Sequence, residues 1–144
     1  MGTTIFHGCK VALYLGPRLV ILQRDDRPDI PFPGLWDFPG GGREGDESPE
    51  ETLFREVREE IDLHLTPADL LWRCELDAAH TKGARVHFFV AQRPATDAAR
   101  IVLGDEGQGW RLVSEAAFLA LPDAVPSLPG RLRLWQAERA RQGR

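Results

Sequence analysis

Three glutamates, Glu56, Glu59 and Glu60, have the residue type and spacing needed to bind a divalent cation. On a helix that turns by about 100° per residue, Glu59 lies about 60° to one side of Glu56, and Glu60 lies about 40° to the other. The three carboxylates therefore share one face of the predicted helix. A solvated acidic surface has the same pattern, and the neighbouring charges discriminate between the two interpretations.

Arg55 is the cation nearest to these acids in the sequence. Glu51 and Glu59 each lie four residues from Arg55, so both can be neutralised along the helix. Glu56 and Glu60 also lie four residues apart, but like charges at this spacing destabilise a helix by about 0.2–0.5 kcal/mol. We therefore expect another cation between them. Oxygen ligands without a nearby His or Cys favour Mg²⁺, with Mn²⁺ as a substitute, over Zn²⁺.

The start of the helix that positions these acids is encoded locally. Ser48 is a typical N-cap, Pro49 suits the first helical position, and Glu51 completes a capping box. The helix is predicted to run to Ile61 or Asp62. Its apolar residues lie on an adjacent face that can pack against a sheet, and they are Leu53, Phe54, Val57 and Ile61.

The segment before the helix, residues 25–45, is rich in Pro, Gly and Asp and is predicted to be irregular. A loop of this length inside a small domain is usually functional or disordered. Trp36 and Phe38 are expected on a short strand, which would hold the loop against the core.

The rest of the chain alternates between strand and helix patterns. A hairpin is predicted at residues 10–15 and 18–24, because Gly16-Pro17 separates two β-rich runs. Strands interleaved with a few helices indicate an α/β or α+β architecture. The other predicted elements are strands at residues 70–76, 84–92 and 110–113 and helices at residues 114–121 and 128–141.

The spacing of the charged residues resembles that of a known family. Glu47 follows Gly41 after five residues, and Arg55 follows after seven more, directly before residues 56–63. This order is similar to the Nudix box, G-x5-E-x7-R-E-U-x-E-E-x-G-U with U aliphatic, at every position but one. Asp62 stands where the family has the Gly that ends the helix in a left-handed conformation, which Asp also tolerates.

The resemblance implies a Nudix-like α/β/α sandwich with a central mixed sheet and a loop–helix–loop catalytic motif. It also implies metal-binding and catalytic roles for Glu56, Glu59 and Glu60. Arg55 and Glu47 match the family positions that orient these acids, with Glu47 closing back onto the helix.

Further site residues are expected outside the helix. Glu106 precedes the last predicted strand and is our candidate for an additional metal ligand or general base. The glycine run, residues 40–42, is expected to let the backbone at Gly40 approach a pyrophosphate and to bring the Gly41 carbonyl oxygen near the metal ion. Its alternative interpretation is a simple turn.

Residues that would bind the rest of the substrate follow from the same resemblance. Arg24 and Asp37 match positions that shape the base pocket in MutT-like proteins. Trp36, Phe38 and Trp110 can stack on a base, although aromatic residues more often belong to the core.

The implied activity is Mg²⁺-dependent hydrolysis of a phosphoanhydride bond in a nucleoside diphosphate linked to another group. A nucleoside triphosphate, either unmodified or oxidised, is the first substrate that we consider, with a nucleoside monophosphate and pyrophosphate as products. Alternatives are ADP-ribose, a dinucleoside polyphosphate, capped RNA, or a catalytically silent nucleotide sensor. The presence of all three box glutamates argues against the silent sensor.

Composition is consistent with one globular domain over residues 1–144, with 42% hydrophobic and 28% charged residues. The net charge of −4 disfavours binding of nucleic acid without sequence preference. Cys9 and Cys74 fit neither a disulfide framework nor a zinc site. With no visible signal peptide or membrane span, we expect a cytoplasmic protein that is a monomer or homodimer.

The C-terminal segment is basic, and it is predicted to form an amphipathic helix docked on the domain through Leu128, Leu132 and Trp135. A tail that contacts RNA is the alternative. The basic residues are Arg131, Arg133, Arg139, Arg141 and Arg144.

Overall fold

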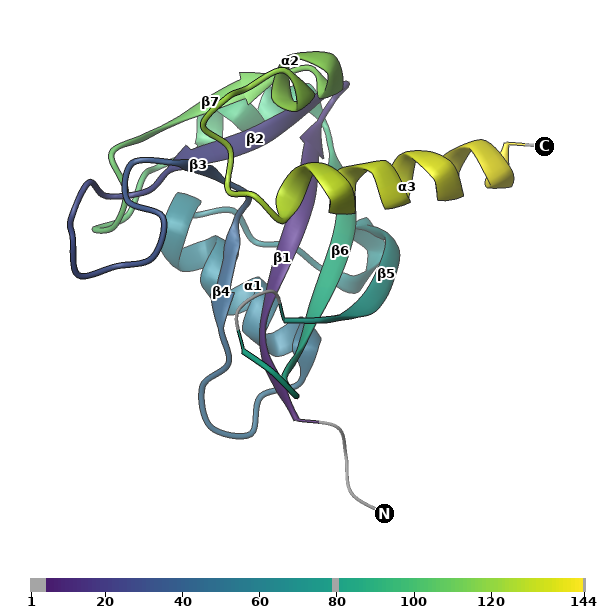
Figure 1. The fold of residues 1–144 in the computed structure, drawn as a ribbon. Helices are drawn as coiled ribbons and strands as arrows, with labels where there is room; N and C mark the ends of the chain where they lie inside the picture. The colour runs from purple at the N-terminus through teal and green to yellow at the C-terminus, as the bar shows by residue number, and fades with distance from the viewer. Residues whose placement is uncertain (1–4, 79–80, 144) are drawn as a thin grey trace.

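Strand β1 (Phe6–Leu15) lies at the centre of a mixed sheet of seven strands and brings distant segments together (Figure 1). The computed structural model describes residues 5–78 and 81–143. β1 pairs in parallel with β6 (Arg85–Arg93), and β5 (Leu70–Asp77) lies antiparallel outside β6. Parallel and antiparallel neighbours in one sheet confirm the predicted mixed architecture.

The other edge of β1 is divided between two partners. The end of β1 pairs with β2 (Arg18–Gln23), which confirms the predicted hairpin, whereas residues 8–10 pair with β4 (Gly40–Gly42). Between these pairings the backbone N–H of Val11 donates to the carbonyl oxygen of Pro39 at 2.9 Å. The sheet therefore divides at the turn formed by residues 37–40.

β2 carries the remaining strands, and it pairs antiparallel with β3 (Trp36–Asp37) and with β7 (Gly109–Val113). Each of the predicted strands is present with ends shifted by a few residues. β4 was not predicted, because three consecutive glycines have low strand propensity.

Helices cover both faces of the sheet, as the layered prediction requires (Figure 1). α1 (Pro49–Ile61) packs on one face, and α2 (Glu115–Leu119) and α3 (Leu128–Gln142) pack on the other. Alternate residues of β1 face the two layers, as expected for a buried strand. The α1 layer includes Val11, Leu13, Leu53, Val57 and Ile61, and the α2–α3 layer includes Ala12, Tyr14, Phe118, Leu128, Leu132 and Trp135.

Both ends of α1 match the prediction. Ser48 and Glu51 form a reciprocal capping box, with the Glu51 amide 3.1 Å from the Ser48 hydroxyl and the Ser48 amide 2.8 Å from the Glu51 carboxylate. Asp62 ends the helix in the left-handed region, with φ 58° and ψ 29°. The helix that positions the glutamates is therefore fixed at both termini.

Two short 3₁₀ helices, Pro67–Asp69 and Ala95–Arg100, were not predicted. The helix predicted at residues 114–121 is shorter than expected, because Ser114 is its N-cap and α2 ends at Leu119. Within residues 5–78 and 81–143, no helix is both long and apolar enough to cross a membrane.

Candidate active site

Arg55 is the most highly connected residue on the acidic face of α1. Its Nε and Nη2 atoms donate to the two carboxylate oxygens of Glu47 at 2.7 and 3.0 Å. Its Nη1 atom donates to Glu56 at 3.1 Å and to Glu59 at 3.2 Å. Glu51, expected to pair with Arg55, instead caps the helix through the Ser48 amide. Arg55 therefore ties the loop before α1 to its acidic face.

Glu47 closes back onto α1. Besides Arg55, it accepts hydrogen bonds from the Thr52 hydroxyl at 3.1 Å and from the Glu44 amide at 2.9 Å. These donors, Arg55 above all, lower the pKa of Glu47 to about 2. Glu47 is thus fully satisfied by protein groups and acts as an anchor for Arg55.

Glu60 has the opposite environment. Burial raises its pKa to about 8, although Lys10 and a hydrogen bond from Gly40 oppose that shift. The Gly40 amide donates to its carboxylate at 2.8 Å. Within the described part of the chain, Glu60 has no ion pair at salt-bridge distance. A half-buried carboxylate with a single neutral donor is poorly compensated in its ionised form.

Glu56 lies against Gly41 at the start of the box. A Cβ atom on Gly41 would come within 2.4 Å of the Glu56 carboxyl carbon, so only glycine allows this approach. Burial also raises the pKa of Glu56, while Arg55 opposes the shift. The Gly41 carbonyl oxygen faces Gly8, where a Cβ would approach it to 2.3 Å. The Gly41 carbonyl oxygen thus lies against β1, and its approach to a metal ion stays a prediction.

A cavity of about 170 Å³ brings together residues from four separate parts of the sequence. It lies where β2, the turn before β4, the end of α1 and the segment before β7 converge. Five of the predicted site residues line it. The lining includes Arg24, Asp37, Phe38, Glu60 and Glu106, together with Asp25 and Arg27, which the sequence did not single out.

Glu106 reaches this cavity because its segment is bonded to the end of α1. The amides of Val102 and Gly104 donate to the carbonyl oxygens of Ile61 and Glu60 at 3.1 and 2.9 Å. Glu106 itself is exposed and lines the cavity. Glu106 and Glu60 are distant in the sequence, but both line this cavity.

Asp37 lies at the division of the sheet and is 5% exposed. One of its carboxylate oxygens accepts from Lys10 Nζ at 2.8 Å and from Arg24 at 2.9 Å, and the other accepts from the Phe38 amide at 2.8 Å. Arg24 also donates to the carbonyl oxygen of Pro31 at 2.9 Å. Lys10 was missed in the sequence, although a single charge at the start of an apolar strand was a usable signal.

The predicted aromatic residues are mainly core residues. Trp36 is 6% exposed, lies under the guanidinium of Arg111 and does not line the cavity. Phe38 is fully buried and stacks on Phe118 with ring centroids 4.7 Å apart. Trp110 packs against the α1 layer. The structure therefore gives Trp36 and Trp110 no stacking surface in this cavity.

The residues around α1 fit a hard divalent cation by their chemistry. Glu60 and Glu56 are carboxylates whose burial disfavours their ionised form, and a cation would restore it. Among residues 5–78 and 81–143, however, no three acidic, His or Cys side chains gather closely enough to hold an ion. Glu59 is paired with Arg55 at 3.2 Å.

The remaining predictions concern the two cysteines and the C-terminal helix. Cys9 and Cys74 are free. Leu128, Leu132 and Trp135 are buried, which confirms that α3 docks on the domain. Two of the basic residues on α3 are paired with acids, Arg139 with Glu115 and Arg141 with Glu138; Arg131 and Arg133 have no such pair in the described chain, and Arg144 lies outside the described residues.

Comparisons with known proteins agree with this geometry. The NUDIX domain family matches residues 10–135. An RNA pyrophosphohydrolase from Gluconacetobacter diazotrophicus is 31% identical over 118 residues, which are 76% of this chain and 63% of that relative. An 8-oxo-dGTP diphosphatase from Proteus vulgaris is 50% identical over 38 residues, 26% of this chain and 34% of the relative.

A solved structure has the same fold. The MutT protein from Methanosarcina mazei Go1 superposes with a TM-score of 0.73 and 20% identity, covering 96% of this chain and 99% of the other. The chain spans 63% and 34% of the lengths of the RNA pyrophosphohydrolase and the 8-oxo-dGTP diphosphatase, less than two thirds of each.

Proposed function

The chain belongs to the NUDIX domain family, and from that membership we propose that it hydrolyses a phosphoanhydride bond in a nucleoside diphosphate linked to another group. Its cofactor is Mg²⁺, which Mn²⁺ can replace. The substrate that we propose is a nucleoside triphosphate, which yields a nucleoside monophosphate and pyrophosphate.

The observation that supports this proposal most strongly is the cavity shared by Glu60, Glu106, Arg24 and Asp37. Acids that can bind a cation and arginines that can bind phosphate line the same space. Because acids predominate in the lining, a phosphorylated ligand needs a bridging cation to bind there. Strongly perturbed carboxylates in a cavity are typical of functional sites.

The chemistry assigns distinct tasks to the side chains. When bound, a divalent cation neutralises the negative charge that builds on the phosphate oxygens. Glu56 and Glu60 would hold this cation, and Glu59 and Glu106 would act as further ligands or as the base. In the reaction, a water oxygen bonds to phosphorus, its proton passes to a carboxylate, and the bridging P–O bond to the leaving pyrophosphate breaks. Arg24 orients the substrate.

The size of the cavity supports a compact substrate. At about 170 Å³ it is smaller than the 300–1,000 Å³ typical of pockets for drug-sized ligands. The similarity to an 8-oxo-dGTP diphosphatase over 38 residues makes an oxidised purine nucleotide the first triphosphate to test.

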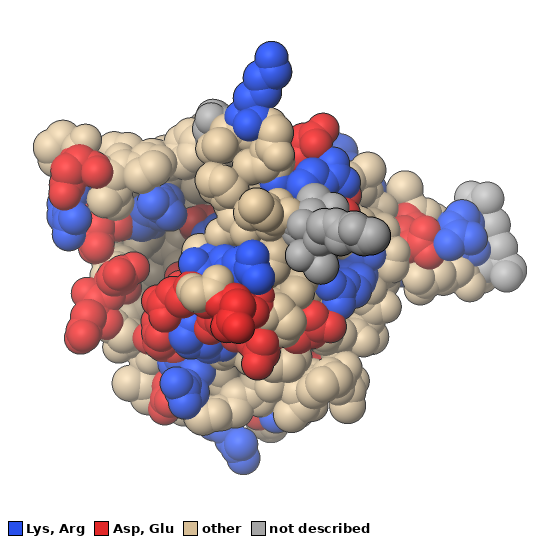
Figure 2. Space-filling view, turned by 90° about the horizontal axis from the view of Figure 1, so that it is seen from below, with Lys and Arg blue, Asp and Glu red and all other residues tan. Residues whose placement is uncertain are grey.

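An RNA 5′ end is the second candidate, because a relative matched over 118 residues is an RNA pyrophosphohydrolase. Binding a longer RNA requires basic residues along its backbone. Figure 2 shows acidic and basic side chains mixed on the face seen from below, without a continuous basic surface. The net charge of −4 also favours the free nucleotide.

A substrate panel tests the proposal. Nucleoside triphosphates, 8-oxo-dGTP, ADP-ribose, a dinucleoside tetraphosphate and 5′-triphosphorylated RNA are each incubated with Mg²⁺, with and without EDTA. We expect pyrophosphate release from a triphosphate, abolished by EDTA. Faster turnover of RNA, ADP-ribose or the dinucleotide would replace the proposed substrate. Tight nucleotide binding without turnover of any compound would instead indicate a silent sensor.

A further inference from the structure

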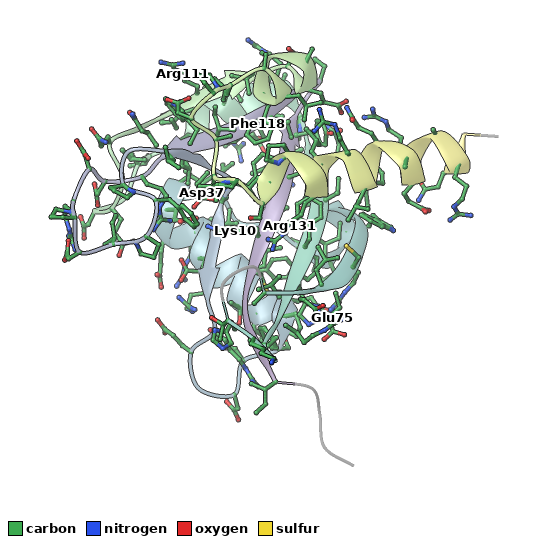
Figure 3. All side chains as sticks on the ribbon, viewed as in Figure 1. Lys10, Asp37, Glu75, Arg111, Phe118 and Arg131 are labelled. Atoms are coloured by element: carbon green, nitrogen blue, oxygen red, sulfur yellow. The ribbon has the colours of Figure 1, made fainter. Side chains whose placement is uncertain are left out.

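Lys10 holds the turn between β3 and β4 through all three of its ammonium protons. Its Nζ atom lies 2.8 Å from the Asp37 carboxylate and 3.3 Å from the carbonyl oxygens of both Phe38 and Gly40. Figure 3 shows Lys10 and Asp37 near one another where β1 and β4 separate. An ammonium group has three donors, and each finds an acceptor here.

The turn bonded by Lys10 also contacts α1. The carbonyl oxygens of Phe38 and Gly40 accept from Lys10, and that of Pro39 accepts from the Val11 amide. In a trans peptide the C=O and N–H groups point in opposite directions. The Pro39–Gly40 peptide therefore directs its carbonyl at β1 and its N–H at the Glu60 carboxylate, 2.8 Å away.

Neutralising Asp37 does not by itself explain Lys10. Arg24 contacts the same carboxylate oxygen at 2.9 Å, so Asp37 would keep a cationic partner without Lys10. The contacts that only Lys10 supplies are those to the two carbonyl oxygens. An arginine in its place has a planar fork of donors rather than a compact ammonium, so it does not match three converging acceptors.

We propose that Lys10 is a positioning residue, which fixes the turn at residues 37–40 so that the Gly40 N–H holds the Glu60 carboxylate in the active site. Its consequence for catalysis rests on the proposed function, whereas its effect on the turn does not. Gly40 allows this arrangement because it has φ +134° and a Cβ there would lie 2.1 Å from the Cys9 carbonyl oxygen.

The chain offers a direct spectroscopic test, because Lys10 and Lys82 are its only two lysines. Protein labelled with ¹⁵N in lysine has two side-chain ammonium groups, and Lys82→Arg identifies that of Lys82, which is exposed. We expect a slowly exchanging ammonium signal from Lys10 and a rapidly exchanging one from Lys82. Equally rapid exchange of both signals would overturn the proposal without requiring any variant at Lys10.

Variants then test the effect on Glu60. In Lys10→Met we expect faster hydrogen exchange of the Gly40 amide and a kcat lower by about 10²-fold, the effect of a misplaced catalytic group, with KM little changed. Lys10→Arg should not restore kcat, and Lys82→Met should match wild type. In Lys10→Met/Asp37→Asn, Gly40 exchange should stay fast, because the carbonyl contacts remain lost.

Two results would contradict this role. The first is an unchanged exchange rate of the Gly40 amide in Lys10→Met. The second is a wild-type exchange rate of the Gly40 amide in the double variant, because it would mean that Lys10 serves only to neutralise Asp37. If wild-type protein hydrolyses no compound of the panel, the proposed function fails, but the exchange of the Gly40 amide still decides whether Lys10 positions the turn.

Discussion

Two glutamates on opposite faces of the sheet have contrasting environments. Glu115 on α2 accepts from both terminal nitrogens of Arg139, at 2.6 and 2.9 Å, from Gln136 at 2.8 Å and from the hydroxyl of Tyr14. These donors lower its pKa to about 2. Glu60 on α1 has one amide donor, and burial raises its pKa to about 8.

The difference shows which of the two carboxylates receives all of its hydrogen-bond and ion-pair partners from the protein itself. The chain satisfies the ionised form of Glu115, so this residue joins β1, α2 and α3. Glu60 is half-buried and lines the cavity, without a protein cation at ion-pair distance among the described residues. Leaving a buried charge uncompensated is costly, and such costs are typical of sites that await a ligand.

The largest predicted effect comes from replacing Glu60, the carboxylate without a cationic partner in the described chain. Glu60→Gln should lower kcat by about 10³-fold, as expected for removal of a group that stabilises charge at the reacting centre, while the protein stays folded. Steady-state hydrolysis at saturating Mg²⁺ measures kcat, and circular dichroism shows whether the variant is folded. Near-normal turnover by the folded variant would remove Glu60 from the active site.

A methyl group beside Glu56 should have the next largest effect. Gly41→Ala places a Cβ within 2.4 Å of the Glu56 carboxyl carbon, so the carboxylate must move, and we expect kcat to fall by about 10²-fold. Gly130→Ala is the matched control, because no atom lies within 4 Å of its added Cβ. Equal activity in the two variants would show that the position of Glu56 is not critical.

Replacing Glu115, the carboxylate that the protein itself neutralises, should affect stability and leave activity near wild type. Glu115→Gln keeps the shape of the side chain but weakens its bonds to Arg139 and Tyr14. We expect the free energy of unfolding to fall by about 1.5–3 kcal/mol, the range for hydrogen bonds to charged groups. Urea denaturation measures this change, and an accompanying loss of kcat as large as that in Glu60→Gln would contradict the contrast.

The two carboxylates should also give opposite pH dependences of stability in metal-free protein. Below the ordinary carboxylate pKa of 4.5 the unfolded chain binds the proton that Glu115 lacks, so stability from Glu115 is lost as the pH falls towards about 2. Between 4.5 and about 8 the folded protein retains a proton on Glu60 that the unfolded chain releases, so this residue lowers stability as the pH rises.

Thermal unfolding of wild type, Glu60→Gln and Glu115→Gln across this pH range measures both slopes. Glu60→Gln should lack the decline above pH 4.5, and Glu115→Gln should lack part of the loss in acid. Identical curves for wild type and Glu60→Gln would show that Glu60 is ionised normally in the folded protein.

Much of α1 and its loop was predictable because the relevant signals are local. Ser48, Pro49 and Glu51 specify the start of the helix, and Asp62 adopts the expected left-handed cap. The resemblance to the Nudix box implied that Glu47 closes back onto the helix, and Glu47 does so through Arg55. These features depend on residues close in sequence, whose geometry follows from the helix itself.

The features that were missed depend on contacts between distant residues. Nothing near Gly40 in the sequence indicates that it pairs with Lys10 or that the Gly41 carbonyl faces Gly8. The indole ring of Trp36 could stack on a base, but the pairing of β3 with β2 directs this side chain into the core. Such orientations are set by strand register, which the sequence alone did not specify.

The most direct test of the central claim is a calorimetric titration of Mg²⁺ into metal-free protein at pH 7, in two buffers with different protonation enthalpies. Because Glu60 is largely protonated at that pH, ion binding should release protons in wild type, and the release should be lost in Glu60→Gln. Absence of Mg²⁺ binding, or binding with the same proton release in both proteins, would contradict the account.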